Sequence, residues 1–190
     1  MIDIAVPKGN EEEFIKIAKR IGLKGLVFLY KHAPKNRIAE KDFRIYYGLF
    51  AECRNDLKQT RQFNLVVSNN YSLFSDRKVM VLLTNEEQQG RDHIHQRRSG
   101  LNETMCRDYK EKIFALSFSK VLLAKKKAAV FGRQQQNAML FNKFKSKVII
   151  ASFATSPYEL RAPRDLIAYC RCLGLQKSKE AMYLLENQLK

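Results

Sequence analysis

The segment "VIIASFATSPYELRAPRDLIAYCRCLGL" (residues 148–175) joins an apolar run to a helical pattern through a short polar connector. Val148–Ala151 is typical of a strand that is buried on both faces of a parallel sheet. Pro163 suits the first turn of a helix, where its missing N–H would have had no partner. Gly174 lies where helices commonly end. An apolar stripe at helical spacing lies between these two residues, formed by Leu166, Ile167, Cys170 and Leu173. The segment therefore predicts a strand followed by a helix, the repeating unit of α/β folds.

The rest of the chain continues this alternation of strands and helices. Apolar runs predict seven strands, near residues 2–6, 26–30, 47–52, 65–67, 79–83, 113–118 and 148–151. Helical patterns lie near residues 11–21, 102–112, 120–145, 163–173 and 178–188. A weak eighth strand near 93–96 would close a (β/α)₈ barrel. We therefore predict an α/β fold, a TIM-like (β/α) barrel that is short and somewhat irregular, because 190 residues fall below the roughly 250 typical of such barrels.

Length and composition predict one soluble domain, residues 1–190. Hydrophobic residues make up 45% of the chain, and the mean hydropathy of −0.39 is ordinary for a globular protein. The sequence has no apolar run near the roughly 18 residues that a membrane span needs, and its start resembles no signal peptide. We expect a cytoplasmic protein without membrane partners. The four cysteines lack metal-binding spacing, so we expect reduced thiols at Cys53, Cys106, Cys170 and Cys172.

A strong excess of positive charge indicates a polyanionic partner. Thirty-five Lys and Arg residues against nineteen Asp and Glu give a formal charge of +16. Residues 97–147 carry thirteen of these cations against three acids, and no acid occurs between residues 112 and 158. Salt bridges within such a segment cannot neutralise it, so phosphate is the expected counter-charge and nucleic acid the leading partner. The alternative is a surface that is cationic without a specific partner.

Cations that we expect to contact RNA cluster in a few segments. "RDHIHQRR" (91–98) ends in two arginines, and "AKKKAAVFGRQQQN" (124–137) joins a lysine run to amides that can bind sugar or base edges, namely Gln134, Gln136 and Asn137. Arg161 and Arg164 lie before and after Pro163, beyond the C-terminal end of the predicted strand 148–151, where α/β proteins bind ligands. The candidate RNA-binding residues are Arg97, Arg98, Arg107, Lys125, Lys126, Lys127, Arg133, Arg161 and Arg164. The alternative for the lysines is that they form a solvated helix face. The alternative for Arg161 and Arg164 is that they pair with Asp165 or Glu159 and stabilise the turn.

The sequence indicates no catalytic centre. His93 and His95 would share one face of a strand and begin a metal site together with His32, but the remaining ligands do not appear. Neither a nucleophilic triad nor a pair of carboxylates stands out, so we predict no catalytic residues and no metal. A metal-dependent barrel phosphoesterase that uses these histidines remains one alternative. A general basic RNA-binding or chaperone protein is another.

Two stretches of the chain resemble a known family. "IIASFATSPYELRAPRDLIAYCRCLGL", followed by "KSKEAMYLL", is similar to the C-terminal signature of ribonuclease P protein component 3 of archaea, whose eukaryotic relatives are the Rpp30-like proteins. The family motif R-[SA]-P-R-D-[LI] is matched by residues 161–166, "RAPRDL". The start, "MIDIAVPKGN", is similar to the opening strand of the family with its D-[IL]-x-[VI]-P pattern.

This resemblance implies a barrel related to metal-dependent phosphoesterase barrels but without their metal ligands. It also implies a subunit of ribonuclease P, the ribonucleoprotein endonuclease whose RNA removes the 5′ leader from precursor tRNA. The chain would then bind and stabilise the ribonuclease P RNA together with other protein subunits, and would meet precursor tRNA through that complex. The isolated chain would be inactive and bind no cofactor, while Mg²⁺ would serve the RNA-based holoenzyme.

Overall fold

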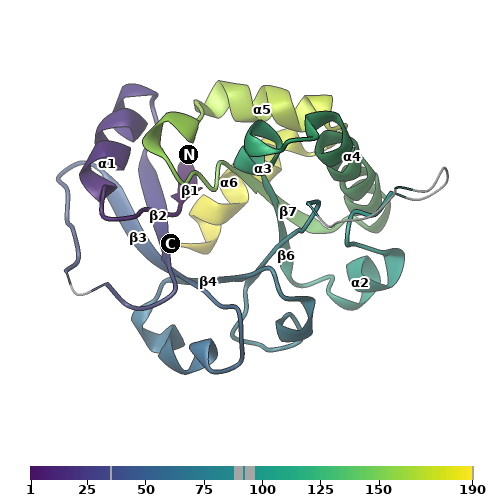
Figure 1. The fold of residues 1–190 in the computed structure, drawn as a ribbon, viewed down its shortest axis with the longest axis horizontal. Coiled ribbons are helices and arrows are strands. Elements are labelled where there is room, and N and C mark those ends of the chain that lie inside the picture. Colours follow the sequence, from purple (N-terminus) through teal and green to yellow (C-terminus); the bar gives the residue numbers. More distant parts are fainter. Residues whose placement is uncertain (35, 88–91, 93–96, 190) are drawn as a thin grey trace.

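The computed structural model describes residues 1–34, 36–87, 92 and 97–189. Within these ranges, seven parallel strands pair in chain order and curl into a barrel surrounded by helices (Figure 1). The strands are β1 (Ile2–Ala5), β2 (Gly25–Tyr30), β3 (Arg44–Phe50), β4 (Leu65–Ser68), β5 (Val81–Leu83), β6 (Ile113–Ser117) and β7 (Lys147–Ala151). The predicted TIM-like barrel and its seven strands are confirmed. The expected eighth strand, near 93–96, lies outside the described residues.

The segment after β7 closes the barrel against β1. Ala5 and Ala154 form a parallel bridge, in which the N–H of Val6 donates to the carbonyl of Ala154 at 2.8 Å. Oδ1 of Asp3 accepts a hydrogen bond from the N–H of Ser152 at 2.7 Å. Burial raises the pKa of Asp3 to about 6, although the hydrogen bonds from Ser152 oppose this effect. A buried acid therefore ties the first strand to the segment that follows the last one.

Helices cover the outside of the barrel, and several are short. They are α1 (Glu11–Arg20), α2 (Glu103–Asp108), α3 (Phe118–Leu123), α4 (Lys127–Phe144), α5 (Pro163–Cys172) and α6 (Ser178–Gln188). Short 3₁₀-helices follow β3, β4 and β7, namely η1 (Asp56–Gln62), η2 (Tyr71–Leu73) and η3 (Pro157–Glu159). These short elements explain how a barrel fits into this length of chain. In the described part of the chain, no helix is both long and apolar enough to span a bilayer.

The prediction of one continuous helix over residues 120–145 is wrong. Residues 120–145 form two helices rather than one, because Ala124 adopts an extended conformation with φ −62° and ψ 135°. The side chain of Ser117 caps α3 by accepting from the N–H of Lys120 at 3.3 Å. The helix therefore starts directly at the end of β6. The break gives the connector between α3 and α4 a position on the surface.

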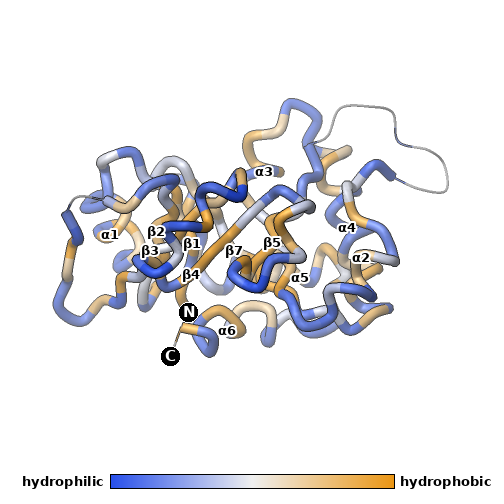
Figure 2. Tube along the Cα trace, turned by 90° about the horizontal axis from the view of Figure 1, so that it is seen from below, coloured by the Kyte–Doolittle hydropathy of each residue, from blue (hydrophilic) through white to orange (hydrophobic). Residues whose placement is uncertain are grey.

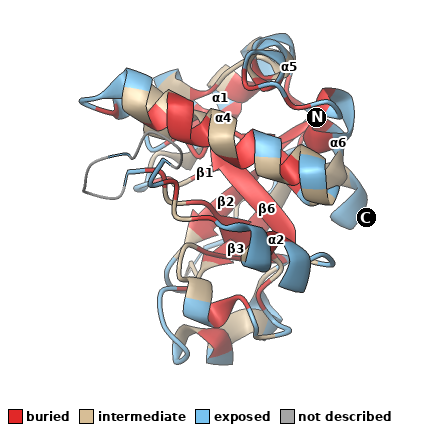
Figure 3. Cartoon of the chain, turned by 90° about the vertical axis from the view of Figure 1, so that its right-hand side faces the viewer, coloured by how far each residue is buried: buried red, intermediate tan, exposed pale blue. Residues whose placement is uncertain are grey.

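Apolar side chains form two layers, because successive strand residues point to opposite faces of the sheet. The barrel interior is filled by Ile2, Ile4, Val27, Leu29, Leu65, Val67, Val81, Leu83, Ile113, Ala115, Ile149 and Ala151. Gly48 fits among them because a Cβ there would lie 2.4 Å from Cδ2 of Leu29. The alternate strand residues, such as Phe28 and Phe114, pack against the helices. Buried residues accordingly gather in the strands and along one side of α4 (Figure 3).

Helix α6 closes one end of the barrel and leaves the other end open. Leu185 packs with the barrel interior, and Figure 2 shows α6 beneath the strands. Glu186 binds the amino group of Met1 at 3.4 Å and the guanidinium of Arg44 at 2.9 Å, both at the starts of strands. The closed end is thus the N-terminal end of the strands. Ligands have access from the C-terminal end, as in other parallel barrels.

Candidate nucleic-acid interface

A pocket of about 340 Å³ opens at the C-terminal end of the strands, and we call it the barrel mouth. Its walls are mainly apolar, formed by Val6, Leu29, Phe50, Leu83, Leu123 and Phe153. Its polar lining consists of Tyr30, Lys31, Glu87, Ser117, Ser119, Lys120 and Thr155. The pocket lies where parallel barrels bind their ligands, but its lining favours an apolar or planar group rather than a metal ion.

The described residues show no grouping for a metal ion. Among them, no three His, Cys, Asp or Glu side chains lie close enough to share one. Glu87 supplies the only carboxylate in the described lining of the mouth. His32 is exposed, whereas His93 and His95 lie outside the described residues. The phosphoesterase alternative thus depends on side chains that the structure does not place.

The lysine run lies next to the barrel mouth. Leu123, the last residue of α3, lines the mouth, and the connector to α4 follows it directly. Lys125, Lys126 and Lys127 are all exposed there. Because α3 starts at the end of β6, this connector belongs to the C-terminal rim of the barrel. Three of the predicted RNA-binding cations therefore face solvent together at the open end.

Arg161 is held on the same rim by the chain around it. Its Nη1 donates to the carbonyls of Tyr158 at 2.9 Å and Leu160 at 2.8 Å. Its guanidinium carbon lies 5.1 Å from the centre of the Phe118 ring, a cation–π contact. The turn is therefore braced through carbonyls and a ring and not through the expected Glu159, which accepts from the N–H of Thr155 instead. The remaining guanidinium donors leave a phosphate role open.

Arg164 differs from Arg161 in its surroundings. It is exposed in the first turn of α5, where the N-cap residue, Ala162, provides no side-chain hydrogen bond. No ion pair or hydrogen bond of its side chain is seen within the described residues. The N–H groups of Asp165 and Leu166 in this turn both donate to the carbonyl of Ala162, at 3.0 and 3.2 Å, and Pro163 has no N–H. Of the two motif arginines, Arg164 is the one that can change partners without cost to the fold.

A second group of predicted cations lies along α4, away from the motif. The backbone of Arg97 exchanges two hydrogen bonds with the amide of Gln136, at 2.6 and 2.9 Å, and its guanidinium lies against Gly132. The guanidinium carbon of Arg107, on α2, lies 6.0 Å from the centre of the Phe144 ring. Gly132 and Phe144 are about 18 Å apart along the helix at 1.5 Å per residue. Arg97 and Arg107 are thus separate points on the surface, and Arg98 follows Arg97 with its N–H bound to Asp92 at 2.8 Å.

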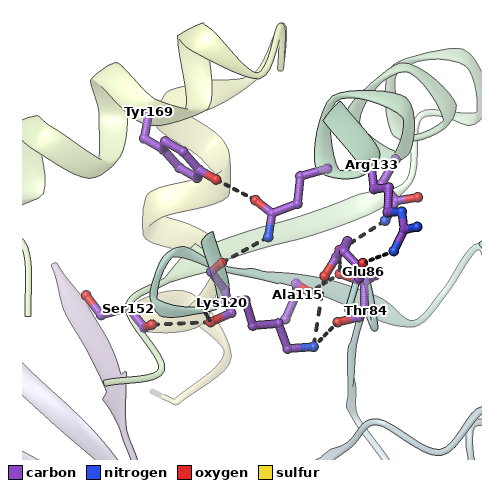
Figure 4. A network of polar contacts seen from close by, with 10 residues as sticks. Thr84, Glu86, Ala115, Lys120, Arg133, Ser152 and Tyr169 are labelled. Carbon is purple, nitrogen blue, oxygen red and sulfur yellow. Dashed lines mark hydrogen bonds and ion pairs between the residues drawn. The ribbon is translucent and has the colours of Figure 1, made fainter. Parts of the chain in front are cut away.

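Arg133 has a different place from the one that the sequence suggested. Its side chain is only 7% exposed, and its Nε donates to Asp92 at 2.8 Å. Its Nη1 donates to the backbone carbonyl of Glu86 at 2.8 Å, as Figure 4 shows from close by. Arg133 therefore fastens the loop after β5 to α4. With its guanidinium buried, Arg133 is not part of the exposed cationic surface.

The amides of α4 are also used within the protein. Nε2 of Gln134 donates to the carbonyl of Ser117 at 2.9 Å, and its Oε1 accepts from the hydroxyl of Tyr169 at 2.6 Å. Nδ2 of Asn137 donates to Glu86 at 3.0 Å. Both amides are fully buried, so the expectation that they bind sugar or base edges is wrong. Gln136 is likewise bonded to Arg97.

A buried acid and lysine lie at the centre of this network, and sequence reasoning missed them. Glu86 is fully buried and accepts from Thr84, whose hydroxyl also lies 2.9 Å from the carbonyl of Ala115. Nζ of Lys120 donates to the carbonyl of Thr84 and lies 3.9 Å from Glu86 (Figure 4). Burial raises the pKa of Glu86 and lowers that of Lys120, while each partner opposes the effect on the other. The only signal in the sequence was the position of both residues just beyond strand ends.

Comparisons with known proteins identify a shared fold. No model of a protein family and no curated protein matches the sequence. A chain in a cryo-EM structure of archaeal ribonuclease P with mature tRNA has a TM-score of 0.72 and 18% identity, covering 100% of this chain and 90% of that chain. A crystal structure of an uncharacterised protein reaches a TM-score of 0.37 with 10% identity, covering 92% of this chain and 45% of that chain, which is too low to support an argument. At 18% identity the first match establishes similarity of fold.

Proposed function

We propose that the chain is a protein subunit of ribonuclease P, corresponding to protein component 3, and that it binds and stabilises the catalytic RNA. The observation that carries the proposal is the fold match, over the whole chain, to a chain in a structure of archaeal ribonuclease P with mature tRNA. The "RAPRDL" motif at residues 161–166 supports the same assignment from the sequence.

The surface of the protein fits this role. Lys125–Lys127 and Arg164 are exposed at the open end of the barrel. Arg161 is partly buried there and donates through Nη1 to two carbonyls, so its other N–H groups can bind a phosphate. Cations that face solvent on one rim can neutralise phosphates that would otherwise repel one another in a folded RNA. The chain would therefore raise the activity of the RNA subunit without taking part in the chemistry. Mg²⁺ and the reacting groups would belong to the RNA, and other protein subunits would complete the cytoplasmic complex.

Recovery of the bound RNA tests this proposal most directly. The tagged chain is isolated from its native cells, and the RNA that accompanies it is sequenced. One dominant structured RNA, with cleavage of precursor tRNA by the isolated complex, is the expected result. A broad mixture of ribosomal and transfer RNAs would indicate a general RNA-binding protein instead. Metal-dependent phosphoesterase activity of the chain alone would contradict the proposal.

A further inference from the structure

We propose that the barrel mouth binds one unpaired nucleobase of the RNA, while the lysine run beside it holds the adjoining phosphates. This inference rests on the proposed function, because it names a contact that the RNA would make. It concerns a pocket rather than the basic surface as a whole. It therefore predicts a contribution to RNA binding that is not electrostatic.

The shape and lining of the mouth suit a flat ring. A volume of about 340 Å³ lies within the range of small-ligand pockets. Phe50 and Phe153 supply aromatic surface, and Leu29, Leu83 and Leu123 supply aliphatic surface. Proteins that bind extruded or single-stranded bases use such apolar walls for stacking and a few polar groups for the base edge. The mouth has both kinds of group.

Ser119 is a polar group without a partner in this pocket. The residue lines the mouth and is only 3% exposed, and its hydroxyl makes no hydrogen bond within the described residues. Its N–H is engaged with the carbonyl of Ser152 at 3.0 Å, so the backbone position is fixed. A buried hydroxyl without a partner destabilises a fold, and such exceptions need an explanation. The hydroxyl is itself closed to solvent, and rotation of the side chain about χ1 toward the mouth would let a polar atom on a base edge become its partner.

Phe153 shows that the backbone at the mouth is under strain. Its φ of 50° lies in the left-handed region, which is uncommon for an aromatic residue. This residue lies two positions beyond the end of β7 and directly before Ala154, which forms the bridge with Ala5. Strain of this kind concentrates at ligand-binding sites. Here it accompanies an aromatic side chain in the lining of the mouth.

The charge around the mouth favours RNA over an apolar segment of a protein. The lining carries two lysines, Lys31 and Lys120, against one acid, Glu87, and Lys125–Lys127 add three positive charges beside it. Lys31 and Lys120 already contact Glu52 and Glu86, so we assign the phosphates to Lys125–Lys127, which begin two residues beyond Leu123. An apolar side chain from a partner protein would use neither these lysines nor the Ser119 hydroxyl. A nucleotide would use both.

A matched pair of substitutions tests the proposal in the full chain. Leu123 and Met139 are both exposed apolar residues of helices, at 58% and 70%, but only Leu123 lines the mouth. Leu123→Glu and Met139→Glu change the net charge equally, and neither removes a buried side chain. The probe is a single-stranded 12-nucleotide RNA with one central 2-aminopurine. Its Kd is measured by fluorescence anisotropy at low salt, and the 2-aminopurine emission reports stacking.

We expect Leu123→Glu to weaken binding about fivefold or more relative to Met139→Glu, the loss expected for one stacked base. An abasic nucleotide at the probe position should weaken binding to the unsubstituted chain but not to Leu123→Glu. Leu123→Ala and Met139→Ala repeat the comparison without a new charge, and equal melting temperatures check folding.

Equal Kd values for the two variants, with tight binding by the unsubstituted chain, would overturn the base pocket and leave the proposed function intact. Absence of binding of this probe by the unsubstituted chain would also overturn the base pocket, whereas the proposed function is decided separately by the RNA that is recovered with the tagged chain. A third outcome is that Leu123→Glu no longer binds a protein partner but has the same RNA affinity as Met139→Glu. This outcome would assign the mouth to a protein and overturn the inference.

Discussion

The two arginines of the "RAPRDL" motif should respond differently to the same conservative change. Arg161→Lys and Arg164→Lys both keep the positive charge but remove the planar guanidinium, with its fixed pattern of donors. Arg161 uses that pattern to bind two carbonyls and to lie over Phe118, whereas Arg164 is exposed. We therefore expect Arg161→Lys to affect mainly stability and Arg164→Lys mainly RNA binding.

The contacts give the size of each effect. Two hydrogen bonds worth about 0.5–1.5 kcal/mol each, together with part of an exposed cation–π contact, give a loss of about 2 kcal/mol for Arg161→Lys. For a chain of 190 residues, this corresponds to a melting temperature lower by about 4–8 °C. Arg164→Lys should change stability by less than about 0.5 kcal/mol. Its loss of bidentate phosphate binding should lower RNA affinity severalfold.

Thermal unfolding and RNA binding, measured per folded molecule, separate these effects. Arg171→Lys is a matched control, because Arg171 is an exposed arginine in the last turn of the same helix, α5. An unchanged melting temperature of Arg161→Lys would refute the energy assigned to its contacts. RNA affinity of Arg164→Lys equal to that of the control would refute the phosphate contact, and the RNA-binding surface would then be limited to the lysine run.

Three further results are expected. RNA affinity should fall with salt at a log–log slope near −4, from five or six phosphates at about 0.7 each, and Lys→Gln at Lys125–Lys127 should reduce the slope by about 2. The same change at Lys16, Lys58 and Lys179, which are exposed on other elements, is the control, and an equal reduction would contradict a localised site. Asp3→Asn should be more stable than the unsubstituted chain at pH 8, because the ionised Asp3 is disfavoured above its pKa of about 6, and this advantage should shrink as the pH falls through about 6 toward 3.8. A difference in melting temperature that stays constant from pH 5 to 8 would show that Asp3 does not titrate in this way. Finally, the isolated chain should not cleave precursor tRNA, because the sequence shows neither a ligand set nor an acid–base pair, and cleavage lost on substitution of His93 or His95 would be evidence against this.

Strand positions could be predicted because the barrel buries them on both faces. Runs such as "GLVFLY" (25–30) and "IFALS" (113–117) are almost wholly apolar over five or six residues, which is typical of a covered parallel strand. The break between α3 and α4 had no such signal, since neither Gly nor Pro occurs in "LLAKKKA" (122–128). Its cause is tertiary, because α3 starts at the end of β6 whereas α4 packs on the outside of the barrel against α2.

The candidate site could be predicted only where its residues face solvent. The exposure of Lys125–Lys127 follows from their charge. Arg133 and Gln134 are buried instead, because the face of α4 that packs against the barrel is itself polar. Hydrophobic periodicity cannot identify such a face, because the groups that bury it, Glu86 and Tyr169, come from distant parts of the chain. The barrel mouth was missed for the same reason, since its lining comes from the ends of several strands.

The structure also shows why net charge is a poor measure of the surface that we propose to bind RNA. Lys112 donates to the carbonyls of Asp76 and Val79 at 2.7 and 2.6 Å, and Arg133 is buried, so these cations support the fold. Lys143 and Lys147 pair with Glu103 and Glu111 in exposed salt bridges, which are worth only about 0–1 kcal/mol and can exchange a carboxylate for a phosphate. Among the described residues, Lys125–Lys127 show no ion pair and need no such exchange. A phosphate that approaches this part of the rim therefore meets cations without a carboxylate partner in the described chain, beside the pocket that we propose for the base.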